Sequence, residues 1–400
     1  MIQTPFYYYD TELLSTTLEA LYEAIGAYNF KIHYAVKANS ETRILKIIES
    51  YGLGTDCVSG NEIKKSLDNG FQSEEIVFAG VGKTDDEIRT AITNDILSIN
   101  CESIEEFEVI NEIALEMGKT ANIALRLNPN IDAHTHHHIT TGLDENKFGI
   151  SVDDLDFALD ELKKHPSLNL NGIHFHIGSQ IMNLHPYIKL CYVANDILGH
   201  LKERKIKIEH INMGGGLGIN YSDPESQLIP DFKNYFDIFK KNLIVDANQT
   251  VHFELGRSIV GQMGSLISKV LYVKKGKSKN FTIIDAGMTD LIRPALYNAV
   301  HKIENISSDE SPENYQVVGP ICESTDNFGS IDLPTTSRGD YFKFRSAGAY
   351  GQVLSSNYNL RENARAIYSD QFDLEELPHN SKELKGVSPV KNNEVQAMLV

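Results

Sequence analysis

Lys37 stands at the end of a short apolar run, residues 32–36, and small polar residues follow it. A lysine in such a position most often lays its stem along apolar surface and keeps its ammonium in water. It performs chemistry only where other reactive groups gather around it. The first step is therefore to ask which polar residues occupy the same place at the ends of other apolar runs.

Polar side chains and glycines recur at or near the ends of later apolar runs. Asp56 lies near the end of the second run, and Arg126 lies late in the fifth. The last three runs contribute His174 and His176, then Gly214, Gly215 and Gly216, and finally Glu254 and Arg257. In a barrel of parallel strands these ends converge on one face, where such enzymes hold their active sites.

This combination of residue types suits pyridoxal phosphate. The amine of Lys37 could form a Schiff base, and the backbone N–H groups of the triple glycine could approach a phosphate closely. A carboxylate at a strand end could pair with the pyridine nitrogen. The triple glycine alone is equally compatible with a tight turn, and it lacks the GxGxxG spacing and downstream acid of a dinucleotide site.

Eight apolar runs alternate with amphipathic segments between about residues 30 and 260. They cover residues 32–36, 53–58, 76–80, 96–100, 123–127, 172–177, 209–213 and 251–255. Capping boxes are predicted at Thr84 with Glu87 and at Ser103 with Glu106, each opening a helix. Eight strand–helix units predict a (β/α)8 TIM barrel, and an open doubly wound sheet is the alternative with similar alternation.

The pattern changes after about residue 265, where strand-like runs follow one another with a turn at Lys275 and Gly276. This predicts a C-terminal antiparallel, β-barrel-like domain, which the strand-like FYYYD near the N-terminus could join. We expect the barrel to span 26–265 and the β domain to comprise 1–25 and 266–375. Residues 376–400 are polar and aperiodic, which predicts a tail of uncertain order.

The composition narrows the class of protein. The chain has 400 residues, of which 41% are hydrophobic, and a formal net charge of −18. This charge disfavours nucleic acid and anionic membranes as partners. The N-terminus lacks the pattern of a signal peptide, and no apolar stretch is long enough to span a bilayer, so we expect a cytoplasmic protein. The four cysteines form no CxxC pair.

Several longer motifs resemble those of a known family. They are YAVKAN, GTDCVSGNEI, NPNIDAHTHHHITTGLDENKFGI, GIHFHIGSQI, NMGGGLG, FELGRS, DAGMTDLIRPALY, GPICESTD and GAYG, in this order. Over about residues 5–370 the chain resembles the diaminopimelate decarboxylases, members of the alanine-racemase-like, fold-type III pyridoxal-phosphate decarboxylases. The resemblance implies conversion of meso-2,6-diaminopimelate to L-lysine and CO2, the final step of lysine biosynthesis.

The resemblance also implies cofactor contacts for individual residues. Lys37 is expected to form the Schiff base, His176 to stack on the pyridine ring, and Glu254 to keep the ring nitrogen protonated. Asp56 and Arg126 resemble supporting residues near the Schiff base and the ring hydroxyl. The other expected cofactor contacts are Ser179, Gly214, Gly215, Gly216, Leu255, Gly256, Arg257 and Tyr350.

The resemblance further implies a substrate site shared between two subunits. Arg257, Arg293, Tyr297 and Tyr350 match substrate contacts, and the two arginines can bind carboxylates in a fork. Cys322 and Glu323 match a pair that a second subunit contributes. Cys322 is then the expected proton donor, and Glu323 the ligand for the amine at the reacting centre. These roles predict a homodimer whose active sites lie across the interface.

Some features leave alternatives open. The family motif Glu-Pro-Gly-Arg has Leu255 in place of proline here, and we expect the chemistry to be unchanged. Histidines at 134 and 136–138 could bind a cation, but the family motif in this loop also begins Asp-Ala-His-Thr-His, so no metal is predicted. Three competing functions remain. They are decarboxylation of ornithine, arginine or carboxynorspermidine, racemization of an amino acid, and non-catalytic binding of pyridoxal phosphate by a barrel protein.

Overall fold

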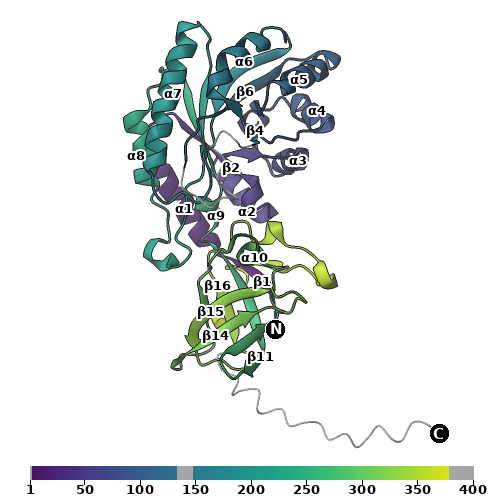
Figure 1. The fold of residues 1–400 in the computed structure, drawn as a ribbon, viewed down its shortest axis with the longest axis vertical. Coiled ribbons are helices and arrows are strands. Elements are labelled where there is room, and N and C mark those ends of the chain that lie inside the picture. The colour runs from purple at the N-terminus through teal and green to yellow at the C-terminus, as the bar shows by residue number, and fades with distance from the viewer. Residues whose placement is uncertain (1, 133–146, 378–400) are drawn as a thin grey trace, which may run out of the picture.

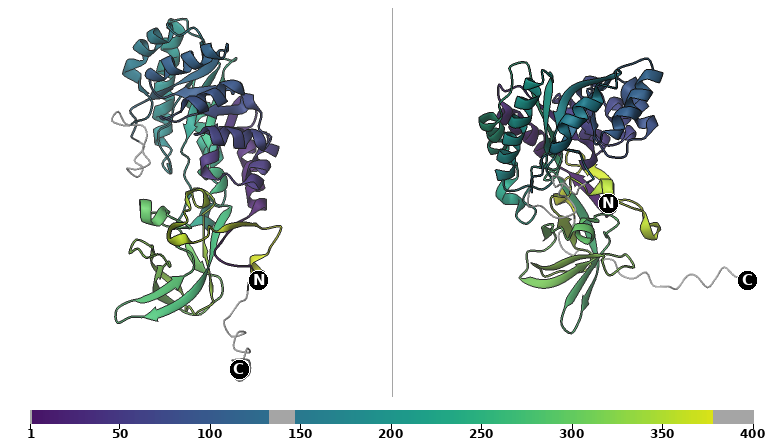
Figure 2. Two further views of the ribbon diagram at one scale, coloured as in Figure 1. Left: turned by 90° about the vertical axis from the view of Figure 1, so that its right-hand side faces the viewer. Right: turned by 45° about the horizontal axis from the view of Figure 1, so that its top comes forward.

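The computed structural model describes residues 2–132 and 147–377, so the histidines at 134 and 136–138 and nearly all of the expected tail lie outside the described residues. The described part forms two regions, a barrel wrapped by helices and a β domain at one of its ends (Figure 1). Figure 2 shows that the helices surround the barrel strands, whereas the β domain projects away from them.

The barrel contains eight parallel strands at the positions that the apolar runs predicted, in the order β5-β4-β3-β2-β10-β9-β8-β6, closed by pairing of β5 with β6. A short β7 (Ile150–Ser151) pairs with the end of β6. The barrel strands are β2 (Phe30–Ala35), β3 (Gly54–Cys57), β4 (Ile76–Phe78), β5 (Ser98–Cys101), β6 (Ala121–Asn128), β8 (Leu168–His174), β9 (His210–Gly215) and β10 (Thr250–Leu255). Closure rules out the open doubly wound sheet.

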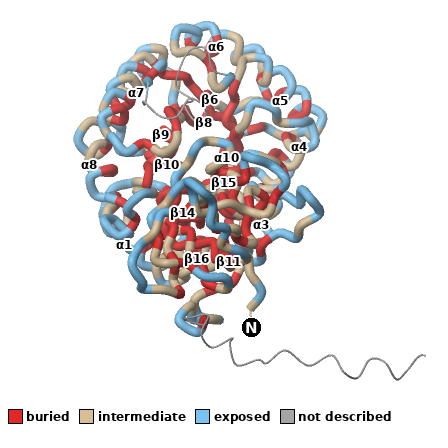
Figure 3. The backbone as a smooth tube through the Cα atoms, turned by 60° about the horizontal axis from the view of Figure 1, so that its bottom comes forward, coloured by how far each residue is buried: buried red, intermediate tan, exposed pale blue. Residues whose placement is uncertain are grey.

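The helices form the outer layer of the barrel and bury their apolar stripes against it. They are α1 (Thr11–Ile25), α2 (Thr42–Ser50), α3 (Gly60–Asp68), α4 (Asp85–Thr93), α5 (Glu105–Glu116), α6 (Leu155–Leu162), α7 (His185–Glu203) and α8 (Phe232–Asn242). In α2, Ile44, Leu45 and Ile48 are buried as their helical spacing predicts. Figure 3 shows buried residues following the strands and exposed residues following the helix surfaces.

One of the two predicted capping boxes forms. Thr84 accepts a hydrogen bond from the backbone N–H of Glu87, and the Glu87 side chain returns one to the backbone of Thr84. The box expected at Ser103 and Glu106 is wrong, because α5 begins at Glu105 and has no side-chain cap. Glu106 instead accepts hydrogen bonds from the ammonium of Lys83 and from the backbone N–H of Glu102.

The interior of the barrel is polar rather than uniformly aliphatic. His33 Nε2 lies 3.0 Å from His252 Nδ1, and the rings of His210 and His252 stack with centroids 4.7 Å apart. All three imidazoles are buried. Burial is the first cause that lowers their pKa values, and it brings the pKa of His210 to about 3. These histidines therefore stay neutral at ordinary pH.

The β domain is an eight-stranded sheet in the order β13-β16-β11-β12-β14-β15, in which β1 pairs with β11 and β17 pairs with β1. The strands are β1 (Phe6–Tyr9), β11 (Gly264–Lys275), β12 (Asn280–Ile284), β13 (Ile303–Asn305), β14 (Pro312–Val318), β15 (Asn327–Pro334), β16 (Tyr341–Phe344) and β17 (Arg365–Tyr368). Most pairings are antiparallel, but β1 with β17 and β12 with β14 are parallel. The predicted turn forms where the Gly276 N–H bonds to the Lys279 carbonyl.

The N-terminal segment joins both regions. Strand β1 pairs with β11 of the β domain, whereas α1 packs against α8 of the barrel layer. Two short helices, α9 (Arg257–Val260) and α10 (Arg293–Tyr297), lie at the junction (Figure 1). The junction therefore brings the end of β10 close to residues that follow β12.

Candidate active site

Lys37 lies in a short 3-10 helix, residues 36–38, directly after β2. Its Nζ atom is 2.6 Å from Asp56 Oδ2 at the end of the neighbouring strand β3. Burial disfavours the ammonium, but the Asp56 carboxylate outweighs it and raises the pKa of Lys37. The side chain remains 35% exposed, so the amine is both ion-paired and reachable from outside.

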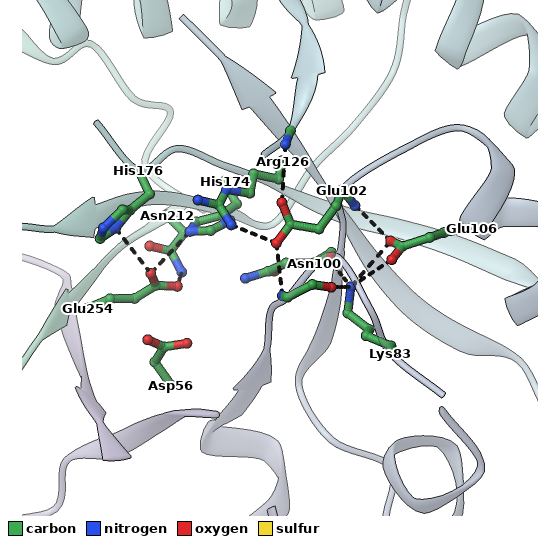
Figure 4. A network of polar contacts seen from close by, with 12 residues as sticks. Asp56, Lys83, Asn100, Glu102, Glu106, Arg126, His174, His176, Asn212 and Glu254 are labelled. Carbon is green, nitrogen blue, oxygen red and sulfur yellow. Dashed lines mark hydrogen bonds and ion pairs between the residues drawn. The ribbon is translucent and has the colours of Figure 1, made fainter. Parts of the chain in front are cut away.

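Glu254 is a buried carboxylate on β10 held by side chains from β8 and β9 (Figure 4). His174 Nε2 on β8 lies 3.1 Å from Glu254 Oε2, and Asn212 Nδ2 on β9 donates to Glu254 Oε1 at 2.8 Å. Burial alone would raise the pKa of Glu254, yet His174 and Lys37 lower it below its usual range. Glu254 is thus an anion inside the barrel. Neither His174 nor Asn212 could be assigned a role from the sequence.

The triple glycine lies where β9 meets the tips of β8 and β10. A Cβ on Gly215 would stand 1.8 Å from the Glu254 carbonyl oxygen, and one on Gly214 would stand 2.2 Å from the Phe175 carbonyl oxygen. Gly216 has φ of +101°, which other residues rarely adopt. The glycines are therefore required by the close approach of the strands, and this approach leaves their backbone free of side chains that would block a ligand.

His176 lies two residues after the end of β8, at the same end of the barrel as the glycines. Its Nδ1 lies 3.9 Å from Glu254 Oε2 and accepts a long 3.4 Å hydrogen bond from the Gly215 N–H. Burial, followed by the charge of Arg126, lowers the pKa of His176 to about 3. A neutral imidazole beside an ionised carboxylate suits stacking on an aromatic ring better than proton transfer.

Arg126 is held by Glu102, a residue that no sequence motif singled out. Its Nη1 lies 2.6 Å from Glu102 Oε1, and its guanidinium lies over the ring of Phe148 at 4.8 Å. Glu102 also accepts hydrogen bonds from the backbone N–H groups of Gly80 and Gly149. Glu102 therefore connects the ends of β4, β5 and β6 to the segment that leads into β7.

Six of the predicted side chains line one cavity of about 640 Å³: His176, Ser179, Arg257, Arg293, Tyr297 and Tyr350. Tyr350 links this cavity to the lysine, because its backbone N–H bonds to the carbonyl of Ala38 at 2.8 Å. Arg257 Nη2 donates to Ser179 Oγ at 2.9 Å, and its guanidinium lies 4.8 Å from the centroid of the Tyr350 ring. The structure thus gathers residues that are far apart in sequence.

Leu255 and Gly256 shape the same corner without presenting polar side chains. Leu255 is 1% exposed and pairs in register with Tyr34 of β2. A Cβ on Gly256 would lie 3.0 Å from the Cβ atoms of Ala35 and Ala38. Gly256 therefore lets the end of β10 approach the segment that carries Lys37.

Cys322 and Glu323 are not among the residues that line this cavity. Cys322 is exposed, and its N–H bonds to Asn359 Oδ1 at 3.3 Å. Glu323 Oε1 accepts a 2.9 Å hydrogen bond from Tyr358. The pair is therefore tied to the segment around 358–360 on the surface of the β domain.

These residues fit pyridoxal phosphate. Lys37 supplies an accessible amine, Glu254 supplies a buried anion for a ring nitrogen, and the glycines carry no side chain that would keep a phosphate away. Within the described residues, several buried polar atoms of this region have no hydrogen-bond partner, namely Asp56 Oδ1, His174 Nδ1 and Arg257 Nε. Such atoms are costly unless a ligand or water satisfies them.

Similar proteins agree with this assignment. Residues 13–261 match the family of the pyridoxal-dependent decarboxylase, pyridoxal binding domain. A diaminopimelate decarboxylase of Bacteroides thetaiotaomicron is 54% identical over 93% of this chain and 97% of the relative. One of Neisseria meningitidis serogroup B is 40% identical over 92% and 88% of the two chains.

A solved structure supports the same assignment. The crystal structure of Helicobacter pylori diaminopimelate decarboxylase complexed with L-lysine superposes with a TM-score of 0.87, at 38% identity, and covers 92% of each chain. No helix within the described ranges is both long and apolar enough to cross a membrane. The chain belongs to the diaminopimelate decarboxylase family of pyridoxal-dependent enzymes.

Proposed function

We propose that this protein removes CO2 from meso-diaminopimelate and yields L-lysine. The observation that carries the proposal is the presence of two buried arginines, Arg257 and Arg293, in the cavity next to Lys37. Their hydrogen-bond partners among the described residues are neutral groups, namely Tyr221 and Ser179 for Arg257 and His301 for Arg293. A substrate with a carboxylate remote from the reacting centre would neutralise them.

The cofactor, when bound, supplies an electron sink for the electron pair that remains on carbon after CO2 departs. Lys37 would hold its aldehyde covalently, and Glu254 would keep a proton on its ring nitrogen. His174 and Asn212 hold the Glu254 carboxylate from the side, at 3.1 and 2.8 Å. Asp56 keeps the amine of Lys37 oriented at 2.6 Å.

The substrate would lie with its remote carboxylate toward the arginines and its reacting centre toward Lys37. Tyr297 and Tyr350 line the same cavity and would contact the carbon chain and amines. An arginine binds a carboxylate through two parallel hydrogen bonds, which fixes orientation as well as affinity. A substrate without that carboxylate would leave two buried cations without an anion, and this disfavours ornithine and arginine.

We further propose a homodimer in which Cys322 and Glu323 act in the partner's site. Three observations support it: neither residue lines its own cavity, both lie at the surface of the β domain, and large apolar side chains are exposed nearby. Tyr358 and Leu360, next to the pair, are 48% and 93% exposed. Cys322 would deliver a proton to the reacting carbon, and Glu323 would hold the amine at that centre.

Release of CO2 from several substrates tests the reaction. Purified protein is supplied with pyridoxal phosphate and then with meso-diaminopimelate, L-ornithine, L-arginine or carboxynorspermidine. We expect the highest kcat/KM with meso-diaminopimelate and L-lysine as its product. Faster turnover of ornithine would refute the substrate assignment, and interconversion of stereoisomers without CO2 would indicate a racemase.

Subunit mixing tests the shared site. Lys37→Ala and Cys322→Ala are each expected to be nearly inactive, but a mixed dimer has one site with both residues intact. Random exchange makes half of the dimers mixed, so about a quarter of wild-type activity should return. If tagged subunits demonstrably exchange and no activity returns, the shared-site model is wrong.

A further inference from the structure

The two cavity arginines are buried, yet the described residues surround them with neutral groups. Arg257 and Arg293 are 7% and 6% exposed. They contact the hydroxyls of Tyr221 and Ser179, the imidazole of His301, and the aromatic rings of Tyr221 and Tyr350. Burial, assisted by the like charge of Arg257, lowers the pKa of Arg293, although an arginine remains charged. Because the two guanidinium groups repel each other, neighbouring side chains must hold each of them in a defined orientation.

Tyr221 lies between them and contacts both. Arg257 Nη1 donates to the Tyr221 hydroxyl at 2.6 Å. The guanidinium carbon of Arg293 lies 4.5 Å from the centroid of the Tyr221 ring, which is a cation–π distance. Because the arginine side chain has only donors, the Tyr221 oxygen must accept this hydrogen bond. A lone pair of that oxygen, and not its hydrogen, therefore faces Arg257. One residue thus orients one arginine through its oxygen and the other through its ring.

His301 holds Arg293 from another direction. Arg293 Nη1 lies 2.8 Å from His301 Nε2, and His301 Nδ1 lies 2.9 Å from the carbonyl oxygen of Arg345. Burial and then Arg293 lower the pKa of His301 to about 3, so the imidazole is neutral. Since arginine can only donate, Nε2 is the acceptor and Nδ1 carries the proton that is given to the Arg345 carbonyl. The edge of His301 also meets the Tyr221 ring at 5.0 Å.

These contacts join the two regions of the molecule. Tyr221 follows β9 in the barrel, whereas Arg293 and His301 belong to the β domain side of the junction. The backbone N–H of Lys302 donates to the Tyr221 carbonyl at 3.2 Å. Glu225, in the same barrel loop as Tyr221, pairs with Lys302 at 2.6 Å and also with Arg345. The orientation of the arginines therefore depends on the way the barrel loop meets the β domain.

We propose that Tyr221 and His301 are positioning residues that aim Arg257 and Arg293 at the carboxylate that the reaction leaves in place, and so make the site select amino acids over diamines. This inference rests on the proposed function, because it assigns that carboxylate to the arginines. L-lysine keeps this carboxylate and cadaverine lacks it. The pair of ligands therefore isolates the contribution of the arginines from that of the amines.

The experiment measures equilibrium binding of L-lysine and of cadaverine to the cofactor-loaded protein by calorimetry. Tyr221→Phe keeps the ring and removes the oxygen. His301→Leu removes the acceptor for Arg293, whereas His301→Gln retains both an acceptor and a donor. Tyr192→Phe, at an exposed position of α7, is the matched control. Cofactor absorbance before and after dialysis shows whether each variant retains pyridoxal phosphate.

We expect Tyr221→Phe and His301→Leu to weaken L-lysine binding at least about tenfold, because each removes a hydrogen bond to a buried charged group. Cadaverine binding should change less than about twofold, and His301→Gln should recover most of the L-lysine affinity. With meso-diaminopimelate, the KM should rise about tenfold and kcat should change little.

Three results would overturn the inference: equal weakening of both ligands, no weakening of L-lysine, or loss of the cofactor in Tyr221→Phe. The binding measurement does not require turnover. If the wild-type protein released no CO2 from meso-diaminopimelate but still bound L-lysine through these residues, the proposed reaction would fail while the positioning role stood.

Discussion

On the barrel side of the active site, charges at the strand ends face opposite charges: Lys37 pairs with Asp56, and Arg126 pairs with Glu102. On the junction side, Arg257 and Arg293 are buried among neutral hydroxyls, an imidazole and aromatic rings. Removal of one member of an ion pair leaves an uncompensated charge, whereas removal of a neutral partner keeps the charges and takes a hydrogen bond from the arginine. The barrel side thus builds the reactive centre, and the junction side is prepared for an anion.

The largest effect is expected from Lys37→Ala, which removes the covalent anchor and leaves Asp56 without its cation. Activity should fall at least ~10³-fold, and the absorbance band near ~420 nm expected for a lysine-bound cofactor should vanish. Lys31→Ala is a matched control on the same strand, because Lys31 is exposed and pairs with Glu75 at 2.8 Å. An unchanged band in Lys37→Ala would contradict the assignment.

Glu254→Gln comes next, because it keeps the shape of the side chain and removes the buried negative charge. The ring nitrogen would lose the anion that keeps it protonated, so kcat should fall ~10²–10³-fold. Cofactor should still bind covalently, which the absorbance spectrum would show. A kcat within a factor of ~3 of wild type would mean that Glu254 has a structural role only.

The sequence predicted the strands of the barrel better than it predicted the side-chain contacts between them. All eight strands lie where apolar runs predicted them, because a strand buried on both faces leaves a local signal that does not depend on distant residues. Lys37 and Glu254 could be selected for the same reason, since a charge at the end of such a run is unusual. Their assignment to particular atoms of the cofactor remains a proposal.

The residues that hold these groups left no such signal. Glu102 approaches Arg126, and His174 approaches Glu254, only because β5, β6, β8 and β10 close into a barrel. Tyr221 and His301 meet only where a barrel loop contacts the β domain. At Ser103 and Glu106 a local signal was present but misleading. Their sequence pattern predicted a capping box, whereas Glu106 pairs with the buried Lys83 instead.

The polar barrel interior predicts a moderate, pH-dependent effect on stability. The pKa of His210 is about 3 in the folded protein and ~6.5 when unfolded, so below about pH 6.5 the unfolded state binds the extra proton and stability falls. Between pH 7.5 and 5.5 the wild type should lose ~1.4 kcal/mol more unfolding free energy than His210→Gln. Denaturant unfolding at both pH values measures the difference.

Tyr192→Phe, at an exposed position, provides the control for this measurement, because it leaves every histidine in place and should lose the same unfolding free energy as the wild type over this interval. Comparison of each variant with itself at two pH values removes the packing cost of the substitution. A wild type and His210→Gln that respond equally to pH would show that His210 takes up a proton in the folded protein.

The smallest effect on catalysis is expected from Leu255→Pro, which restores the proline usual in the family. Strand residues alternate between faces, so Glu254 points into the barrel and Leu255 points out toward the helices. Leu255 is 1% exposed, and its loss of apolar contact should lower stability by ~1–3 kcal/mol. The backbone of Gly256 and the side chain of Glu254 keep their neighbours, so kcat and KM should change less than about twofold. Steady-state kinetics at a temperature well below the unfolding midpoint separates the two effects. A drop in kcat comparable to that of Glu254→Gln would show that the strand end, and not only the charge it carries, controls the reactive centre.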